Sequence, residues 1–184
     1  MNKIFGHFKT ITTHKLMVMR ECFKIGLYKQ GLLHDLSKYG PAEFIPGCKY
    51  YTGTQSPHHK EREANGVSAA WLHHKGRNKH HFEYWVDYGL DGKGLEGTKM
   101  PPNYVAEMMM DRIAASKVYN KGSYNDHLSL EYYEKGKHAY MIHPETRALL
   151  EYMLHMLDEQ GEAVLYEFIR KNLVGKKEYP EIGK

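Results

Sequence analysis

The chain has 184 residues, 41% of them hydrophobic, with 26 basic and 22 acidic side chains and a formal net charge of +4. This length fits one domain with a sizeable core and is short for two, so we expect a single domain over residues 1–184. No stretch approaches the ~20 apolar residues that cross a bilayer, and the N-terminal residues lack a secretory signal. We therefore expect a cytoplasmic protein without a membrane partner, and the mild, unclustered basic excess argues against a nucleic-acid partner.

Histidine is unusually common in this sequence. There are 13 histidines, and histidine is the commonest metal ligand in proteins. The two cysteines, Cys22 and Cys48, have no CxxC spacing and fit free buried thiols better than a disulfide. A metal site in this chain would therefore be built from imidazoles and carboxylates.

The first elements along the chain are predicted to be helical. A cap at Thr12 or Thr13 predicts a helix that runs to about Lys29, with His14 at the start of its inner face. A second short helix is expected over QGLLHDLSKYG, and a Gly-Pro stop signal predicts its end near Tyr39.

Short helices and breaks are expected in the next part of the chain. A short helix follows Pro41, and the Gly, Ser, Thr and Pro content of residues 50–60 predicts a loop. Helix is expected again over about residues 61–74, with a break at Gly76. Asn78 is a good N-cap and predicts that a helix restarts after it.

The C-terminal half is also predicted to be helical after a glycine-rich loop. Residues 89–100 contain four glycines and no periodicity, which predicts a mobile surface loop. Pro101 and Pro102 are placed to open a helix that runs to about Tyr119. The C-terminal helices, within about residues 123–175, are expected near 126–137, after Pro144, and from about Glu162 to Leu173. We therefore expect an all-α fold, a helical bundle with a solvated C-terminal tail.

A buried carboxylate is predicted at His34-Asp35. Leu32, Leu33 and Leu36 surround this pair and indicate a largely buried helix. A buried carboxylate is costly unless it is paired or bound to a metal. By itself the dipeptide also fits a satisfied polar pair in the core.

Two His-His pairs stand close together in WLHHKGRNKHHFEYW, residues 71–85. If Asn78 restarts the helix, His80 and His81 lie in its first turn, while His73 or His74 approaches from the end of the preceding helix. The pairs could thus converge on a metal ion. The alternative is a solvated turn rich in histidine and basic residues.

Asp111 is the third candidate element. It interrupts the apolar run EMMMDRIAAS and shares a helix face with Met108 and Ala115. A carboxylate on an apolar stripe indicates a metal ligand, with a salt bridge to a core Arg or Lys as the alternative. Nitrogen and oxygen ligands without thiolates suit one or two divalent transition-metal ions, such as Mn, Fe, Co, Ni or Zn.

This pattern resembles the HD-domain superfamily of metal-dependent phosphohydrolases. The resemblance is carried, in chain order, by His14, His34-Asp35, the histidine cluster and Asp111. LLHDLSKYG is similar to the HD helix of that superfamily, including its lysine, here Lys38, and HHKGRNKHH is similar to the extra histidines of two-metal members. Residues of about 10–118 carry the resemblance, and the phrase N-x-HH-x-EYW, here residues 78–85, resembles a bacterial and phage branch of the superfamily.

The resemblance implies an HD-type helical bundle with a two-metal site and a metal-activated water that attacks a nucleotide or another small phosphoester. The implied metal ligands are His14, His34, Asp35, His74, His80, His81 and Asp111. Asp35 would bridge the two ions, and the implied catalytic residues are Asp35, Lys38 and His81. Which histidine of each pair ligates stays open. The glycine-tyrosine-proline phrase of the cyclic-dinucleotide phosphodiesterase branch is absent, so that substrate is not expected.

Cationic side chains near the site are candidates for holding phosphate. Lys38 follows His34 by four residues, on the same face of the predicted helix, and is the best candidate. A solvated lysine favoured by the helix dipole is the alternative. Lys75, Arg77 and Arg112 are weaker substrate-binding candidates. The same ligand set also fits two other functions, an HD-type di-iron oxygenase and a non-catalytic nucleotide-binding module.

Overall fold

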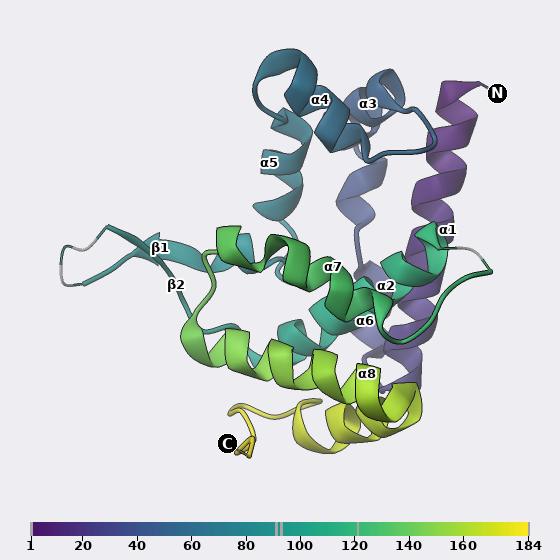
Figure 1. The fold of residues 1–184 in the computed structure, drawn as a ribbon. Helices are drawn as coiled ribbons and strands as arrows, with labels where there is room; N and C mark the ends of the chain where they lie inside the picture. The colour runs from purple at the N-terminus through teal and green to yellow at the C-terminus, as the bar shows by residue number, and fades with distance from the viewer. Residues whose placement is uncertain (1, 91, 93, 121, 184) are drawn as a thin grey trace.

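Figure 1 shows the computed structural model, which describes residues 2–90, 92, 94–120 and 122–183. Its α-helices are, in chain order, α1 (Lys3–Lys24), α2 (Tyr28–Leu33), α3 (Pro41–Tyr50), α4 (Pro57–Asn65), α5 (Ala69–Lys75), α6 (Pro102–Tyr119), α7 (Leu128–Gly136) and α8 (Pro144–Asn172). Short elements complete the described part: the 3-10 helices η1 (Leu36–Tyr39), η2 (Phe82–Trp85) and η3 (Lys137–Ala139), and the strands β1 (Val86–Tyr88) and β2 (Leu95–Gly97). The prediction of a mostly helical protein is confirmed. None of the described helices is long and apolar enough to span a membrane.

The first helix begins earlier and ends earlier than predicted. Asn2, rather than a threonine farther along the chain, caps α1 by accepting a hydrogen bond from the backbone N–H of Ile4. The helix ends at Lys24 because Gly26 adopts a left-handed φ of +85°. His14 therefore lies in the middle of a long helix, which runs along one side of the molecule (Figure 1).

The core lies around α6, which contacts α1, α7 and α8. Fully buried apolar side chains from three of these helices meet there: Val18 and Cys22 from α1; Val105, Ala106, Met109, Met110 and Ile113 from α6; and Leu150, Met153 and Leu157 from α8. Each large side chain among them contributes about 1.5–3 kcal/mol through burial. The methionines of α6 are packing residues. They hold α6 against its neighbouring helices.

A buried carboxylate also joins α1, α6 and α8. Glu21 is 1% exposed and accepts hydrogen bonds from Lys24 at 2.6 Å, Tyr166 at 2.7 Å and Lys117 at 3.0 Å. Burial alone would raise the pKa of Glu21, but these hydrogen bonds outweigh burial and hold the pKa below its usual value. The cluster therefore favours the folded state while Glu21 is ionised.

A small hairpin forms where the sequence predicts a loop. β1 and β2 pair antiparallel, with Val86 opposite Gly97, and the hairpin projects from the helices (Figure 1). Strands of three residues are too short to give an alternating pattern. Gly97 is required for packing, because a Cβ there would collide with the backbone of Ile142 and His143. Asp91 and Lys93, within the predicted loop, lie outside the described residues.

The C-terminal helices fit the prediction closely. A single helix from Pro144 to Asn172 is interrupted at Gly161, whose φ is +82°, so the two predicted helices are confirmed with their boundary. The tail is not simply solvated, because the hydroxyl of Tyr179 donates a hydrogen bond to the Met100 carbonyl at 2.6 Å. This contact ties the tail to the residues that precede α6.

Candidate metal centre

Helical geometry breaks at His34 and Asp35, where the sequence predicts a continuous helix. α2 ends at Leu33, and Asp35 has a left-handed φ of +54°, the only positive φ of a non-glycine among the described residues. Such a conformation costs roughly 1 kcal/mol or more and is typical of functional sites. The ammonium of Lys15 stabilises the break by donating to the carbonyls of Leu32 at 2.7 Å and His34 at 3.1 Å.

This break buries the polar pair and exposes its apolar neighbours. His34 and Asp35 are each 2% exposed, whereas Leu32, Leu33 and Leu36 are 54%, 54% and 48% exposed. The prediction of a buried pair is confirmed, but the prediction of a buried leucine face is wrong. A six-residue helix followed by a left-handed residue turns its leucines outward and its polar end inward.

The predicted metal ligands come together in one buried region. They arrive from separate elements: His14 from α1, His34 and Asp35 from the break, His74 from α5, His80 and His81 from the turn before η2, and Asp111 from α6. They form overlapping groups in which the ligand atoms lie within 4.8 Å of one another: Asp35, His74, His80 and His81; His14, His34 and Asp35; and His34, His80 and Asp111. These groups are able to hold a metal ion.

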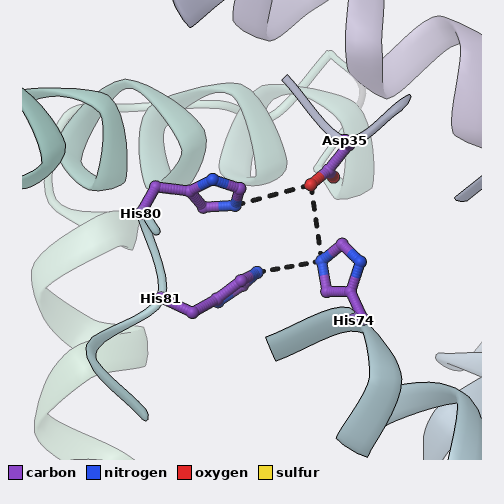
Figure 2. Close-up of side chains that lie close together, drawn as sticks. All are labelled: Asp35, His74, His80 and His81. Atoms are coloured by element: carbon purple, nitrogen blue, oxygen red, sulfur yellow. Dashed lines mark hydrogen bonds and ion pairs between the residues drawn. The ribbon is translucent and has the colours of Figure 1, made fainter. Parts of the chain in front are cut away.

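Asp35 lies between two sets of imidazoles. Its Oδ1 is 3.4 Å from Nε2 of His74 and 3.5 Å from Nε2 of His80, as Figure 2 shows. Its Oδ2 is 3.4 Å from Nε2 of His34 and 3.9 Å from Nε2 of His14. Each oxygen thus faces a different set of nitrogens, which is the arrangement that a carboxylate shared by two cations requires.

Asp111, on α6, is a second carboxylate beside the imidazoles. Its Oδ1 is 2.9 Å from Nε2 of His14 and 3.6 Å from Nε2 of His34, and its Oδ2 is 4.0 Å from Nε2 of His80. The alternative of a salt bridge to a core Arg or Lys is not what the structure shows, because no described Lys or Arg pairs with this carboxylate. Its neighbours are the ligand imidazoles.

Several buried atoms at the centre of this region have no hydrogen-bond partner among the described residues. They are Nε2 of His34, Oδ1 of Asp35 and Nε2 of His80. A buried polar atom left unpaired costs about 1–3 kcal/mol. These atoms are close neighbours, since Oδ1 of Asp35 lies 3.5 Å from Nε2 of His80. Their chemistry fits a cation placed between them.

Glu107 orients two of the imidazoles and was not predicted from the sequence. Its Oε1 lies 2.9 Å from Nδ1 of His34 and 3.2 Å from Nδ1 of His80. A carboxylate only accepts hydrogen bonds, so each Nδ1 carries a hydrogen, and each Nε2 is turned toward the site. Glu107 precedes Asp111 by four residues, so its place on the same helix face was a detectable signal.

Glu43, a second buried acid that the sequence did not reveal, orients His74. It is 2% exposed and accepts from Nδ1 of His73 and Nδ1 of His74, each at 2.7 Å. The outer nitrogen of His73 is occupied by Arg77, whose Nε donates to it at 2.8 Å. Only His74 of the first pair therefore faces the centre, whereas the second pair supplies both His80 and His81.

Asn78 shapes the turn between the two pairs, although it does not cap a helix as predicted. Its Nδ2 donates to the carbonyl of His74 at 2.8 Å and to Oγ of Ser37 at 2.9 Å. Residues 76–81 form a turn that η2 follows. Nε2 of His81 is brought to 2.9 Å from Nε2 of His74 (Figure 2).

The electrostatics of the site favour ionised carboxylates. Burial alone would raise the pKa of Asp35 and of Asp111, but the charge of His34 for the first and a hydrogen bond from His14 for the second outweigh burial and hold both pKa values well below the usual range. Burial and the neighbouring imidazoles hold the pKa of His81 well below its usual value. At neutral pH the two carboxylates are therefore ionised, as metal ligation needs, whereas the same carboxylates outweigh burial and raise the pKa of His34, which would release a proton on binding a metal ion.

Lys38 is the cation closest to the centre. Its Nζ lies 2.6 Å from Oδ2 of Asp35. This contact follows from the left-handed Asp35 and the start of η1, and not from a shared helix face with His34 as predicted. Lys38 is therefore held at the site and is not a solvated surface lysine.

A cavity of about 200 Å³ opens beside the ligands. The described residues that line it are Thr10, Ile11, His14, Lys38, Ser56, His58, Trp71, His74, His81, Asp111, Ala115 and Tyr119. Lys38 is the one Lys or Arg among them. A larger hollow of about 410 Å³, around Lys3, Lys49 and Lys60, is lined by none of the predicted site residues.

The other predicted substrate-binding cations do not line the cavity beside the ligands. Arg77 is paired with His73, and the guanidinium of Arg112 lies 5.7 Å from the ring centre of Tyr133. Lys75 is half-buried on α5. The structure thus brings Lys38 to the ligands and leaves Lys75, Arg77 and Arg112 elsewhere.

Comparison with known proteins places this centre within a family. No curated protein and no solved structure matches the chain. Residues 3–156 match a family described as a family of unknown function (DUF5662), and this range contains every predicted ligand. Because the match covers most of its residues, the chain belongs to the DUF5662 family.

Proposed function

We propose that this chain is a cytoplasmic, metal-dependent phosphohydrolase of the HD-domain type, acting on a nucleotide or another small phosphoester. The observation that carries the proposal is the group of unpartnered buried atoms, His34 Nε2, Asp35 Oδ1 and His80 Nε2, at the point where Asp35 separates two sets of ligands. Nitrogen and oxygen donors without thiolates suit Mn, Fe, Co, Ni or Zn.

The ligands divide into two sets that share Asp35. One ion would be held by His14, His34, Asp35 and Asp111, and a second by Asp35, His74, His80 and His81. When bound, such ions would lower the pKa of a water molecule toward neutrality and offset the charge on phosphoryl oxygens. This chemistry suits phosphoester hydrolysis and needs no oxidant.

The chain's own residues would hold the reactants in place. Glu107 and Glu43 keep the imidazoles turned toward the centre, so little reorganisation is needed when a substrate binds. Lys38, already 2.6 Å from Asp35, is placed to neutralise a phosphoryl oxygen. His81, whose pKa burial and the neighbouring imidazoles hold well below its usual value, would present Nε2 to the second ion and complete its ligand set. In the reaction, a bond forms between the water oxygen and phosphorus, the ester P–O bond breaks, and a proton passes to the leaving oxygen.

The size of the cavity favours a small substrate. At about 200 Å³ it is below the roughly 300–1,000 Å³ of pockets for drug-sized ligands. One lysine lines it, so a substrate with a single phosphate group is better matched in charge than one with a chain of phosphates.

Release of phosphate under different metals and atmospheres tests this proposal. The purified protein is loaded with Mn or with Fe and incubated with a panel of phosphoesters, in air and under argon. Hydrolysis predicts phosphate release with at least one ester in both atmospheres. The Asp35→Ala variant, which lacks the shared ligand, is the matched negative control.

The same experiment separates the alternative functions. A di-iron oxygenase would turn over only with iron and in air, and would consume O₂. A binding module would be stabilised against thermal unfolding by an ester without forming product. Either result would reject phosphoester hydrolysis.

A further inference from the structure

We infer that His58 is a hydrogen-bond acceptor that selects esters whose leaving group carries a hydroxyl. This inference rests on the proposed function, since it concerns the substrate of the same site. His58 lies in the first turn of α4, outside the set of metal ligands, and lines the cavity beside His74 and Trp71. Its ring centre lies 6.2 Å from that of His74 and 5.5 Å from that of Trp71. A ligand at the metal centre would therefore reach it.

A series of buried polar side chains contacts Nδ1 of His58. Oγ of Ser68 lies 2.5 Å from Oε2 of Glu61 and 3.5 Å from Nδ1 of His58. Ser68 is 2% exposed and Glu61 is 5% exposed. Ser68 also accepts a hydrogen bond from the backbone N–H of Trp71 at 3.1 Å, where it caps α5. Helices α4 and α5 thus fix the two ends of this series of hydrogen-bonded side chains.

The hydrogen atoms of these side chains determine the tautomer of His58. A serine hydroxyl has one hydrogen, and a carboxylate only accepts, so the hydrogen of Ser68 goes to Glu61. Ser68 can then only accept from His58, which places the ring hydrogen of His58 on Nδ1. The Nε2 atom is left with a lone pair and no hydrogen. It is the ring nitrogen available to a ligand in the cavity.

The geometry leaves Nε2 of His58 without a hydrogen. The Ser68 hydroxyl fixes the ring hydrogen on Nδ1, and the cation Lys38 lines the same cavity. A neutral imidazole with hydrogen on Nδ1 offers an acceptor at Nε2 and no donor there. A phosphoryl oxygen, which also only accepts, is therefore a poor partner for this atom, and a hydroxyl of the substrate is a good one.

These observations define the class of substrate. Lys38 and several predicted metal ligands line the cavity and suit the phosphoryl group, and His58 and Trp71 line the same cavity. The volume of about 200 Å³ limits the leaving group to a small one. The expected substrate is a small phosphomonoester of a polyol or sugar, in which a hydroxyl reaches His58 while the phosphoryl group lies at Lys38.

Matched pairs of esters test the inference. The pairs are glycerol phosphate with propyl phosphate, and ribose 5-phosphate with its dideoxy analogue. Both binding and hydrolysis are measured with the metal-loaded protein. Because an ester without a hydroxyl would leave this acceptor unpaired once it fills the cavity, the wild type should prefer the hydroxyl-bearing member of at least one pair by roughly 10- to 100-fold. His58→Phe, which keeps a ring and removes the acceptor, should abolish that preference and spare the hydroxyl-free ester.

Two further variants control for structural effects. His58→Gln places an amide oxygen near the position of Nε2 and should restore part of the preference. His59→Phe changes the neighbouring histidine, which is exposed and paired with Glu63, and should leave the preference unchanged. A loss of both esters in equal proportion in His58→Phe would show a structural role and overturn the inference.

The outcomes separate this inference from the proposed function. A binding preference that depends on His58 without any hydrolysis would support the inference and reject the hydrolase. Hydrolysis with the same preference in wild type and in His58→Phe would support the hydrolase and reject the inference. If none of these esters binds, both the inference and the hydrolase are rejected. Nitrogen NMR of the His58 side chain adds a readout that needs no substrate. A hydrogen on Nε2 instead of Nδ1 would contradict the inference directly.

Discussion

Replacing Glu107 with glutamine should weaken metal binding without removing a single ligand. Oε1 of Glu107 accepts a hydrogen bond from Nδ1 of His34 at 2.9 Å and lies 3.2 Å from Nδ1 of His80. The substitution keeps the shape of the side chain but removes the charge that fixes both imidazole tautomers. Residues that orient ligating histidines are typically worth about 10- to 100-fold in metal affinity. Since Glu107 serves two ligands, we expect a loss near 100-fold, or about 2.7 kcal/mol.

Competition titration against a chromophoric chelator measures this loss with cobalt or zinc. Glu159→Gln is a suitable control, because Glu159 is a solvent-exposed glutamate of α8 whose side chain is 66% exposed. Thermal unfolding of the metal-free variants shows whether the fold survives. A Glu107→Gln protein that unfolds cooperatively and binds metal as tightly as wild type would refute the role assigned to Glu107.

Further variants test the shared ligand, the phosphate-binding cation and the buried acid of the core. Asp35→Ala should lose metal and activity together, and full metal occupancy in that variant, measured by elemental analysis, would contradict the bridging role. Lys38→Ala should keep its metal and lose about 10- to 100-fold in kcat/KM for a phosphoester, as expected for one charge-assisted hydrogen bond. Unchanged kinetics would show that Lys38 does not bind the phosphoryl group. The pKa of Glu21 is lower in the folded protein, so its stabilising effect is complete above the unfolded pKa of about 4.3 and is lost as pH falls through the folded pKa. The free energy of unfolding should therefore drop below about pH 5, by up to 1.4 kcal/mol for each unit of pKa difference, and denaturant titrations of Glu21→Gln should show a flatter acid dependence; an equally steep one would place the acid sensitivity elsewhere.

The long helices were predictable from the sequence because their signals are local. Pro101 and Pro102 mark the start of α6, and Gly161 separates the two parts of α8 by a left-handed φ that glycine adopts freely. In contrast, the break at Asp35 has no local signal. It depends on Lys15, which reaches the end of α2 from the neighbouring α1.

The residues of the candidate metal centre were predictable as residue types, but which histidine of the first pair faces the centre was not. His73 and His74 are adjacent in sequence and both contact Glu43, and only the direction in which α5 ends decides that Nε2 of His74 faces Asp35 while Nε2 of His73 accepts from Arg77. Glu43 lies 30 residues before His73, so no spacing rule connects them.

The position of the buried glutamate on α6 did have a local signal in the sequence. Glu107 could have been found, because it precedes Asp111 by one helical turn on the same apolar stripe.

The central claim is that one buried centre, shared through Asp35, holds transition-metal ions. The most direct test is the metal content of the purified chain after reconstitution with Mn, Fe, Co, Ni and Zn in turn, measured by elemental analysis against protein concentration. The account predicts one or two tightly held ions per chain for at least one of these metals, with none retained by Asp35→Ala. A wild-type chain that retains no metal after any of these treatments would contradict it.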